Sequence, residues 1–329
     1  MGRFEKLEHE NKIDSEDLEK IEPNLEKIEP KEFLGYTSLG KVELPNNLQE
    51  IGEEAFKHCT SLSEVHIPPS IGVIKSETFA GCSSLQTATI NKATSIEKNA
   101  FRDCSSLKNI SATNLFKIGD GAFSRCTSLQ QVRFESLKTI GKGAFSGCTS
   151  LREFRIPKTT NKIEDEAFMD CEALLNIHVP GNVKEIGAGA FYGCTSLMVA
   201  DIDSGISEIS DRAFAECTSL TEITLPETVR TIGEDAFVSC MSLETVNVPY
   251  GVIKIGNSAF QNCRGLRTVS IPRTVTEIGE YAFQDCTSLT SIILHNTVKS
   301  IGHDAFLGCE NLKNVTVICS LQEFTKDRQ

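Results

Sequence analysis

The sequence predicts an α/β repeat protein, a solenoid in which one short helical turn and one short β-strand alternate at a fixed period. Two observations lead to this prediction. The stretch IGEEAFKHCTSLSEVHIP, from Ile51 to Pro68, returns in similar form at Ile186, Ile232 and Ile278. Its phenylalanine recurs every 22 or 23 residues, thirteen times in all, at Phe33, Phe56, Phe79, Phe101, Phe123, Phe145, Phe168, Phe191, Phe214, Phe237, Phe260, Phe283 and Phe306.

Within one repeat, two periods follow each other. Ala55, Cys59 and Leu62 are spaced by four and then three residues, which predicts one face of a short helical segment. Val65 and Ile67 alternate with polar residues, which predicts a short, half-buried strand. A proline then follows and ends that strand, because it has no N–H to donate.

Stacking of the repeats is required energetically. One unit of 22 or 23 residues buries too few apolar side chains to offset its loss of backbone entropy. Stacked units cover one another, and their strands pair into a continuous parallel sheet. Because a helical side needs more room per repeat than a strand side, we expect a horseshoe with the sheet on the concave face and short helical turns on the convex side.

The repeats also set the domain boundaries. Residues 1–26 form a charged leader, which is either mobile or a lid on the first repeat. Residues 27–317 form one array of thirteen units. Residues 318–329 are predicted to be a C-terminal cap and tail, since a terminal repeat needs a cover for its open face.

Composition excludes several functional classes. The formal net charge of −12 argues against a nucleic-acid-binding protein, which usually carries a basic surface. The N-terminal thirty residues contain no apolar run, so we expect no signal peptide, no membrane insertion and a cytoplasmic location.

The cysteines are predicted to be buried and reduced. Twelve of the thirteen occupy the same slot in successive repeats, as a small apolar side chain would. The sequence has no CxxC and no Cys–His pair at metal-ligand spacing, so we expect no metal and no cofactor.

No catalytic constellation is visible either. The six histidines are scattered, and neither a P-loop, a dinucleotide fingerprint nor a GxSxG elbow occurs. We therefore expect a protein that is not an enzyme.

The repeat pattern LxxVxIPxxVxxIGxxAFxxC resembles the BspA-like form of the leucine-rich repeat, the type also found in treponemal leucine-rich repeat proteins. The resemblance covers roughly residues 28–318. It implies a right-handed leucine-rich repeat solenoid that acts as an interaction scaffold. Members of this family include bacterial surface proteins that adhere to host matrix proteins.

Candidate binding residues are those expected to point outward from the strands of the concave sheet. Arg133, Arg155 and His178 fall in one column on adjacent strands, with Glu153 nearby. On an acidic protein, this strip suggests an anchor for an acidic segment of a partner protein, because arginine pairs well with carboxylate. A solvated patch of mixed charge is the alternative.

Val199 and Ile293 are apolar residues at outward positions and are further candidate contacts. The predicted function is non-catalytic binding of another protein on the concave face of the solenoid. The alternative is an exported adhesin or structural protein of the cell surface.

Overall fold

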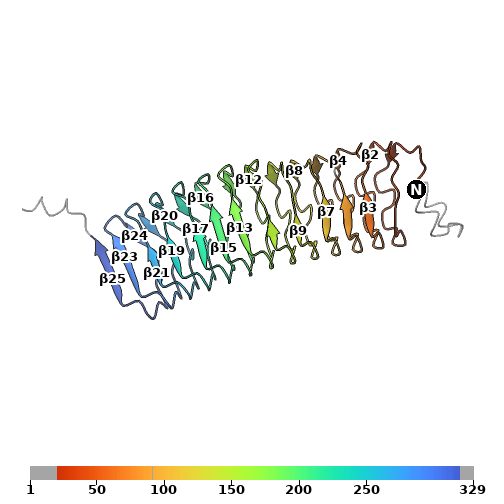
Figure 1. The fold of residues 1–329 in the computed structure, drawn as a ribbon. Coiled ribbons are helices and arrows are strands. Elements are labelled where there is room, and N and C mark those ends of the chain that lie inside the picture. Colours follow the sequence, from red (N-terminus) through yellow and green to blue (C-terminus); the bar gives the residue numbers. More distant parts are fainter. Residues whose placement is uncertain (1–20, 91, 319–329) are drawn as a thin grey trace, which may run out of the picture. The chain divides into compact units, whose positions relative to one another are not determined.

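The computed structural model describes residues 21–90 and 92–318 of the chain (Figure 1). These residues divide into two compact units, Met1–Leu174 and Leu175–Gln329, which we call unit 1 and unit 2. The first repeat contributes one short strand and each later repeat contributes two, all in parallel pairing, and in each unit they form two rows of arrows in Figure 1. We call the strands that follow the leucine of each repeat face A, and the two-residue strands that end in isoleucine face B.

Unit 1 contains five strands of face A and seven of face B. Those of face A are β3 (Glu64–His66), β5 (Thr87–Thr89), β7 (Asn109–Ser111), β9 (Gln131–Val132) and β11 (Glu153–Phe154). Those of face B are β1 (Lys27–Ile28), β2 (Glu50–Ile51), β4 (Val73–Ile74), β6 (Ser95–Ile96), β8 (Lys117–Ile118), β10 (Thr139–Ile140) and β12 (Lys162–Ile163).

Unit 2 repeats the arrangement. Its face A strands are β13 (Asn176–Val179), β15 (Val199–Ile202), β17 (Glu222–Thr224), β19 (Thr245–Asn247), β21 (Thr268–Ser270), β23 (Ser291–His295) and β25 (Asn314–Ile318). Its face B strands are β14 (Glu185–Ile186), β16 (Glu208–Ile209), β18 (Thr231–Ile232), β20 (Lys254–Ile255), β22 (Glu277–Ile278) and β24 (Ser300–Ile301).

Strand pairing keeps the repeats in register, so that equivalent residues lie side by side. In face A, Val65 pairs with Ala88. In face B, Ile140 pairs with both Ile118 and Ile163. Buried and exposed residues alternate along the strands of face A, as the sequence predicts. Face B was not predicted as a sheet, because two residues are too few to show an alternating pattern.

The predicted helical turns are wrong. Residues 21–90 and 92–318 contain no helix, and the segment from Ala55 to Leu62 is a series of turns. The reason is that two residues of every repeat, one just before this segment and one inside it, have positive φ, as Glu54 (55°) and His58 (61°) do. A left-handed residue every fourth position interrupts a right-handed helix before it can continue.

Backbone hydrogen bonds favour these turns over a helix. The Phe56 N–H donates to the Thr78 carbonyl at 2.9 Å, and the His58 N–H donates to the Ala80 carbonyl at 2.8 Å, both in the next repeat. The intervening N–H closes a turn onto the carbonyl three residues earlier. Alternate N–H groups thus bond between and within repeats. An α-helix would direct all of them within one repeat and leave this segment without hydrogen bonds to the next repeat.

Phenylalanine rings form the centre of the core. Neighbouring rings in unit 1 stack with centroids 5.0–5.5 Å apart from Phe33 to Phe168. In unit 2 the same stack runs from Phe191 to Phe306 at 5.2–5.7 Å. Offset stacking of this kind stabilises beyond area burial, so the phenylalanine period is also the packing period.

The cysteines form a second internal ladder, and each acts as more than a small apolar residue. Cys126 is fully buried, and its thiol donates to the Phe101 carbonyl of the preceding repeat at 3.1 Å. The same bond, at 3.1–3.3 Å, is made by the thiols of Cys59, Cys82, Cys104, Cys148, Cys171, Cys217, Cys240, Cys263, Cys286 and Cys309. The prediction of buried, unpaired cysteines is confirmed for these positions, except that Cys309 is only partly buried.

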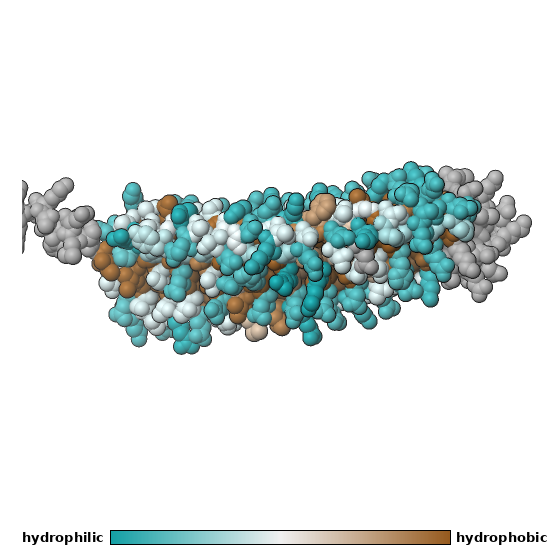
Figure 2. Space-filling view, turned by 45° about the horizontal axis from the view of Figure 1, so that its top comes forward, coloured by the Kyte–Doolittle hydropathy of each residue, from teal (hydrophilic) through white to brown (hydrophobic). Residues whose placement is uncertain are grey.

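The last repeat is open to solvent at its outer side. Val315 and Val317 of β25 are 56% and 58% exposed, whereas Ile292 and Leu294, their partners in β23, are 2% and 6% exposed. Apolar surface is accordingly prominent at the β25 end of Figure 2. The predicted cap lies outside the described residues apart from Ile318, as does the leader apart from residues 21–26.

No helix among residues 21–90 and 92–318 has the length and apolar character that a membrane span requires.

Candidate functional site

Face A is the sheet for which the sequence predicted binding, and it carries all six candidate residues. Arg133, Glu153 and Arg155 belong to unit 1, and each is exposed. His178, Val199 and Ile293 belong to unit 2, where His178 is exposed, Val199 is half-buried and Ile293 is 48% exposed.

Arg133 and Arg155 lie beside each other in unit 1. Strand β11 pairs with β9 so that Glu153 is opposite Gln131 and Phe154 is opposite Val132, which brings the next residues, Arg155 and Arg133, side by side. Adjacent strands are about 4.8 Å apart. Neither guanidinium makes an ion pair within the described part of the chain, so two like charges are adjacent and unpaired, with the Glu153 carboxylate nearby in the sequence.

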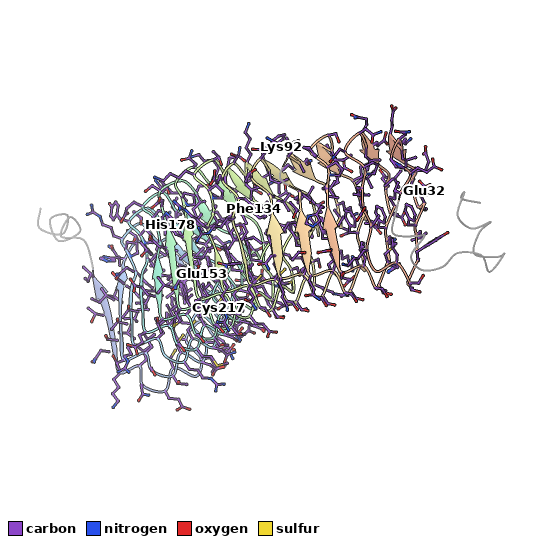
Figure 3. The ribbon with its side chains drawn as sticks, turned by 45° about the vertical axis from the view of Figure 1, so that its right-hand side comes forward. Glu32, Lys92, Phe134, Glu153, His178 and Cys217 are labelled. Atoms are coloured by element: carbon purple, nitrogen blue, oxygen red, sulfur yellow. The ribbon has the colours of Figure 1, made fainter. Side chains whose placement is uncertain are left out.

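Buried aromatic residues adjoin the two arginines along the chain. Phe134 and Phe154, which are both buried, have ring centroids 6.3 Å apart. Phe154 also packs edge-on against Phe145 at 5.0 Å and against Phe168 at 4.7 Å. Figure 3 labels Phe134 and Glu153 at this place in the array. The backbone that carries the two arginines is thus anchored by packed rings in both repeats.

A groove opens next to Arg133. It has a volume of about 370 Å³ and is lined by residues of β7, β9 and the loops that follow them, namely Asn109, Ile110, Ser111, Ala112, Thr113, Gln131, Val132, Arg133 and Glu135. Its walls combine polar side chains, such as Asn109 and Gln131, with apolar surface from residues such as Ile110. The groove can therefore accept a polar, extended segment, but it is too open to enclose a small molecule.

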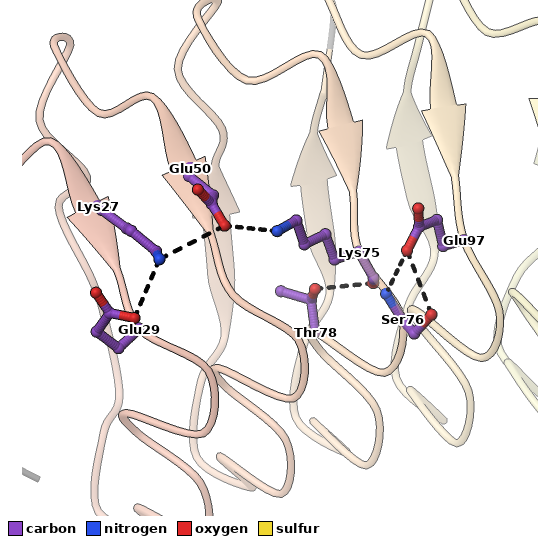
Figure 4. Close-up of polar contacts among 7 residues, drawn as sticks. All are labelled: Lys27, Glu29, Glu50, Lys75, Ser76, Thr78 and Glu97. Carbon is purple, nitrogen blue, oxygen red and sulfur yellow. Dashed lines mark hydrogen bonds and ion pairs between the residues drawn. The ribbon is translucent and has the colours of Figure 1, made fainter.

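The arginine pair differs from the charges on face B. There, Lys27 lies 3.9 Å and Lys75 2.6 Å from the same Glu50 carboxylate, so that the charges of three repeats alternate in sign (Figure 4). The hydrogen bond from Lys75 lowers the pKa of Glu50. At this place on face B a carboxylate lies between two lysines, whereas on face A stacking brings Arg133 next to Arg155.

His178, the third member of the predicted basic strip, faces carboxylates. Its Nδ1 lies 3.1 Å from Asp201 Oδ2, and its Nε2 lies 3.5 Å from Asp203 Oδ2. Asp201 is opposite His178 in the pairing of β13 with β15. Sequence reasoning missed this cluster because it searched for ligands close in the chain, whereas the period of 23 residues is what brings Asp201 to His178.

Val199 and Ile293 are not brought together. Val199 is in β15 and Ile293 is in β23, with β17, β19 and β21 between them on face A. Each is flanked by polar residues of the neighbouring strands, Val199 by Asn176 and Glu222. They are therefore separate apolar positions and do not form one patch.

The buried thiols offer no nucleophile. Burial raises the pKa of Cys148 and Cys263 to about 12, so each is fully protonated at neutral pH. A reactive cysteine needs a lowered pKa and access to solvent. The expectation that the protein is not an enzyme stays a prediction.

A family model now identifies the array. The model of the BspA type leucine rich repeat region matches residues 26–152, 116–244 and 207–327, which together span almost the whole chain. The chain belongs to the BspA-type leucine-rich repeat family. The resemblance inferred from the repeat pattern is thereby confirmed, and over residues 21–90 and 92–318 the repeats of this BspA-type chain are built without helices.

Two solved structures show the same fold. A leucine-rich repeat protein from Bacteroides ovatus is 26% identical, with 91% of each chain covered and a TM-score of 0.54. A leucine rich cell surface protein from Faecalibacterium prausnitzii is 25% identical, with 93% of this chain and 91% of that chain covered and a TM-score of 0.52. Among curated proteins, none matches this BspA-type chain.

Proposed function

We propose that this protein is a non-catalytic interaction module whose unit 1 binds an acidic segment of another protein on face A. Arg133 and Arg155 are the anchors. The observation that supports this role is the adjacent pair of guanidinium groups on a chain with a net charge of −12.

The physical argument starts from repulsion. Two cations on adjacent strands raise each other's energy, and a carboxylate bound between them removes that cost while forming charge-assisted hydrogen bonds. Glu153, the first residue of β11, lies two residues before Arg155, which directly follows that strand. Its carboxylate limits the local positive potential and favours a partner whose carboxylates contact the arginines at a distance from Glu153.

The groove beside Arg133 indicates how such a segment would run. An extended peptide placed there would lie across β7 and β9. Along that path, hydrogen-bonding side chains are available from Asn109 and Gln131. The carboxylate of Glu135, which also lines the groove, would repel an acidic residue of the peptide. An acidic residue held by the arginines and a polar residue in the groove would give both affinity and orientation.

The first test measures binding of a fluorescent hexaglutamate peptide by anisotropy at low salt, with hexalysine as the opposite-charge control. We expect Arg133→Glu/Arg155→Glu to weaken hexaglutamate binding at least tenfold, and Glu153→Gln to strengthen it. The matched control is Lys98→Glu/Lys158→Glu, which changes the charge equally at two exposed turn positions of the same unit.

An equal loss of hexaglutamate affinity in the arginine variant and in the lysine control would refute the proposal, because binding would then depend on net charge alone. Both variants must first show the circular dichroism and melting behaviour of the wild type. Affinity capture from source cells with the same pair of variants then identifies the natural partner.

A role at the cell surface is the second candidate function. It is favoured by the likeness to the Faecalibacterium prausnitzii protein, which is described as a cell surface protein. Antibody labelling of intact and permeabilised source cells separates this role from a cytoplasmic one. Labelling of intact cells would support surface display, and labelling only after permeabilisation would exclude it.

A further inference from the structure

His178, Asp201 and Asp203 converge on one side of face A in unit 2. The pairing of β13 with β15 places His178 opposite Asp201, and Asp203 follows two residues after Asp201, on the same side of the strand. All three side chains are about half exposed. Of the described residues, these alone form a cluster of at least three potential ligand atoms lying within 4.8 Å of one another.

The two carboxylates contact different nitrogens of the imidazole ring. Asp201 Oδ2 is 3.1 Å from Nδ1, which is a hydrogen-bond distance. Asp203 Oδ2 is 3.5 Å from Nε2, which is longer than a hydrogen bond. The Gly181 N–H donates to this same Asp203 oxygen at 3.3 Å and holds the carboxylate in place.

This geometry matches that of a histidine oriented for metal binding. In metal sites, a ligating histidine typically donates its second N–H to a carboxylate, which fixes the ring and makes the ligating nitrogen more basic. Asp201 occupies that supporting position at Nδ1. Two bonds of about 2.0–2.1 Å at a tetrahedral angle separate their donor atoms by about 3.4 Å. The gap of 3.5 Å between Nε2 and Asp203 is of this size.

We propose that His178 Nε2 and Asp203 bind a divalent transition-metal ion such as Zn²⁺, with Asp201 as the residue that positions the imidazole. Water completes the coordination, since the side chains are open to solvent. Mixed nitrogen and oxygen ligands favour zinc, nickel, cobalt or copper, whereas calcium and magnesium require more oxygen ligands than this cluster supplies.

The fold prepares this arrangement in advance. The strand register places His178 opposite Asp201, and the Gly181 N–H holds Asp203, which directly follows β15. Fully buried thiols, such as those of Cys217 and Cys240, are inaccessible inside the array and do not compete for the ion. Figure 3 labels His178 and Cys217. The proposal does not depend on the arginine pair of unit 1.

The test is calorimetric titration of the full chain with Zn²⁺ under reducing conditions, repeated with Ca²⁺. We expect one equivalent of Zn²⁺ to bind and no saturable binding of Ca²⁺. Zinc binding should be lost in His178→Ala and in Asp203→Asn. In Asp201→Asn the affinity for Zn²⁺ should fall by about 10–100-fold. His303→Ala is the control, because His303 is exposed and lies 2.9 Å from Asp304.

Nitrogen NMR of the His178 ring provides a readout that a purely structural role would not change. Zinc should shift Nε2 while Nδ1 stays protonated. An equal loss of Zn²⁺ binding in His178→Ala and His303→Ala would overturn the proposal, since binding would then be a general property of surface histidines. Metallation of Nδ1, or unchanged binding in Asp203→Asn, would overturn it as well.

Discussion

Alkaline pH should destabilise this protein strongly, because its core contains a ladder of thiols. Burial raises the pKa of Cys59, Cys148 and Cys263 to about 12, and it also raises the pKa of Cys82, Cys104, Cys126, Cys217 and Cys240. The hydrogen bond with Cys309, together with burial, raises the pKa of Cys286. An ordinary thiol in the unfolded chain has a pKa of about 8.5. Because the folded values are higher, the stabilisation is complete below about pH 8.5 and is lost as the pH rises towards 12.

The magnitude follows from these nine groups. One pH unit above 8.5, each unfolded thiol is mostly ionised, which lowers the free energy of unfolding by about 1.4 kcal/mol. Nine thiols together give about 13 kcal/mol, which is comparable to the stability of a whole domain. The thiols are divided between the two units, five in unit 1 and four in unit 2, so the stability of each unit should fall steeply between pH 8.5 and 10. In a solenoid, this loss begins in a few neighbouring repeats, because each contacts only its neighbours.

Urea unfolding at pH 7.5, 8.5 and 9.5, followed by circular dichroism under reducing conditions, measures the effect. The control variant is Cys104→Ser/Cys126→Ser/Cys148→Ser, in which hydroxyl groups replace three of the nine thiols. Serine keeps a donor for the phenylalanine carbonyl and does not ionise in this range. We expect the pH-dependent loss of stability in this variant to be about a third smaller. A midpoint that is independent of pH, or an equal decrease in both proteins, would refute the reasoning.

Two further predictions concern the turn segments and the aromatic stack. A methyl group at Gly143 (φ +56°) would lie 3.7 Å from the Ser146 Cβ, which is an ordinary contact. Gly143→Ala should therefore lower the stability by about 1 kcal/mol through left-handed backbone strain alone. Ser258 has a φ of 51°, so Ser258→Gly should leave the stability unchanged or raise it. Urea midpoints measure both, and the same sign of change in the two variants would contradict this explanation of the turns. Phe214→Ala removes a fully buried ring from the stack and should cost about 3–5 kcal/mol, against less than about 1.5 kcal/mol for the exposed Met241→Ala. A similar small cost for both would show that the ring stack contributes little stability.

Much of this architecture could be predicted from the sequence because the same pattern of apolar and polar residues occurs thirteen times. Val65 and its equivalents recur at one slot between polar residues, so the burial of face A and its outward columns follow from alternation. The slot shared by the cysteines likewise predicted their burial. A residue that is placed identically in every copy must meet its own equivalent in the next copy, and this determines the register as well as the core.

The helical prediction failed for a reason that the local pattern cannot reveal. Spacings of four and three, as in Ala55, Cys59 and Leu62, fit a helix and also fit a stack of turns. The choice depends on where the N–H of Phe56 finds its acceptor, and that acceptor lies in another repeat. The left-handed residues at Glu54 and His58 are tolerated because bonds between repeats compensate for their strain.

The sequence by itself determined the repeat, the core slots and the identity of the outward residues. Only the tertiary structure decided which outward charges meet. Stacking brings Arg133 to Arg155, and it brings His178 to Asp201 and Asp203. The physical reason is that residues separated by one period are about 5 Å apart in space, whereas along the chain they are 22 or 23 residues apart.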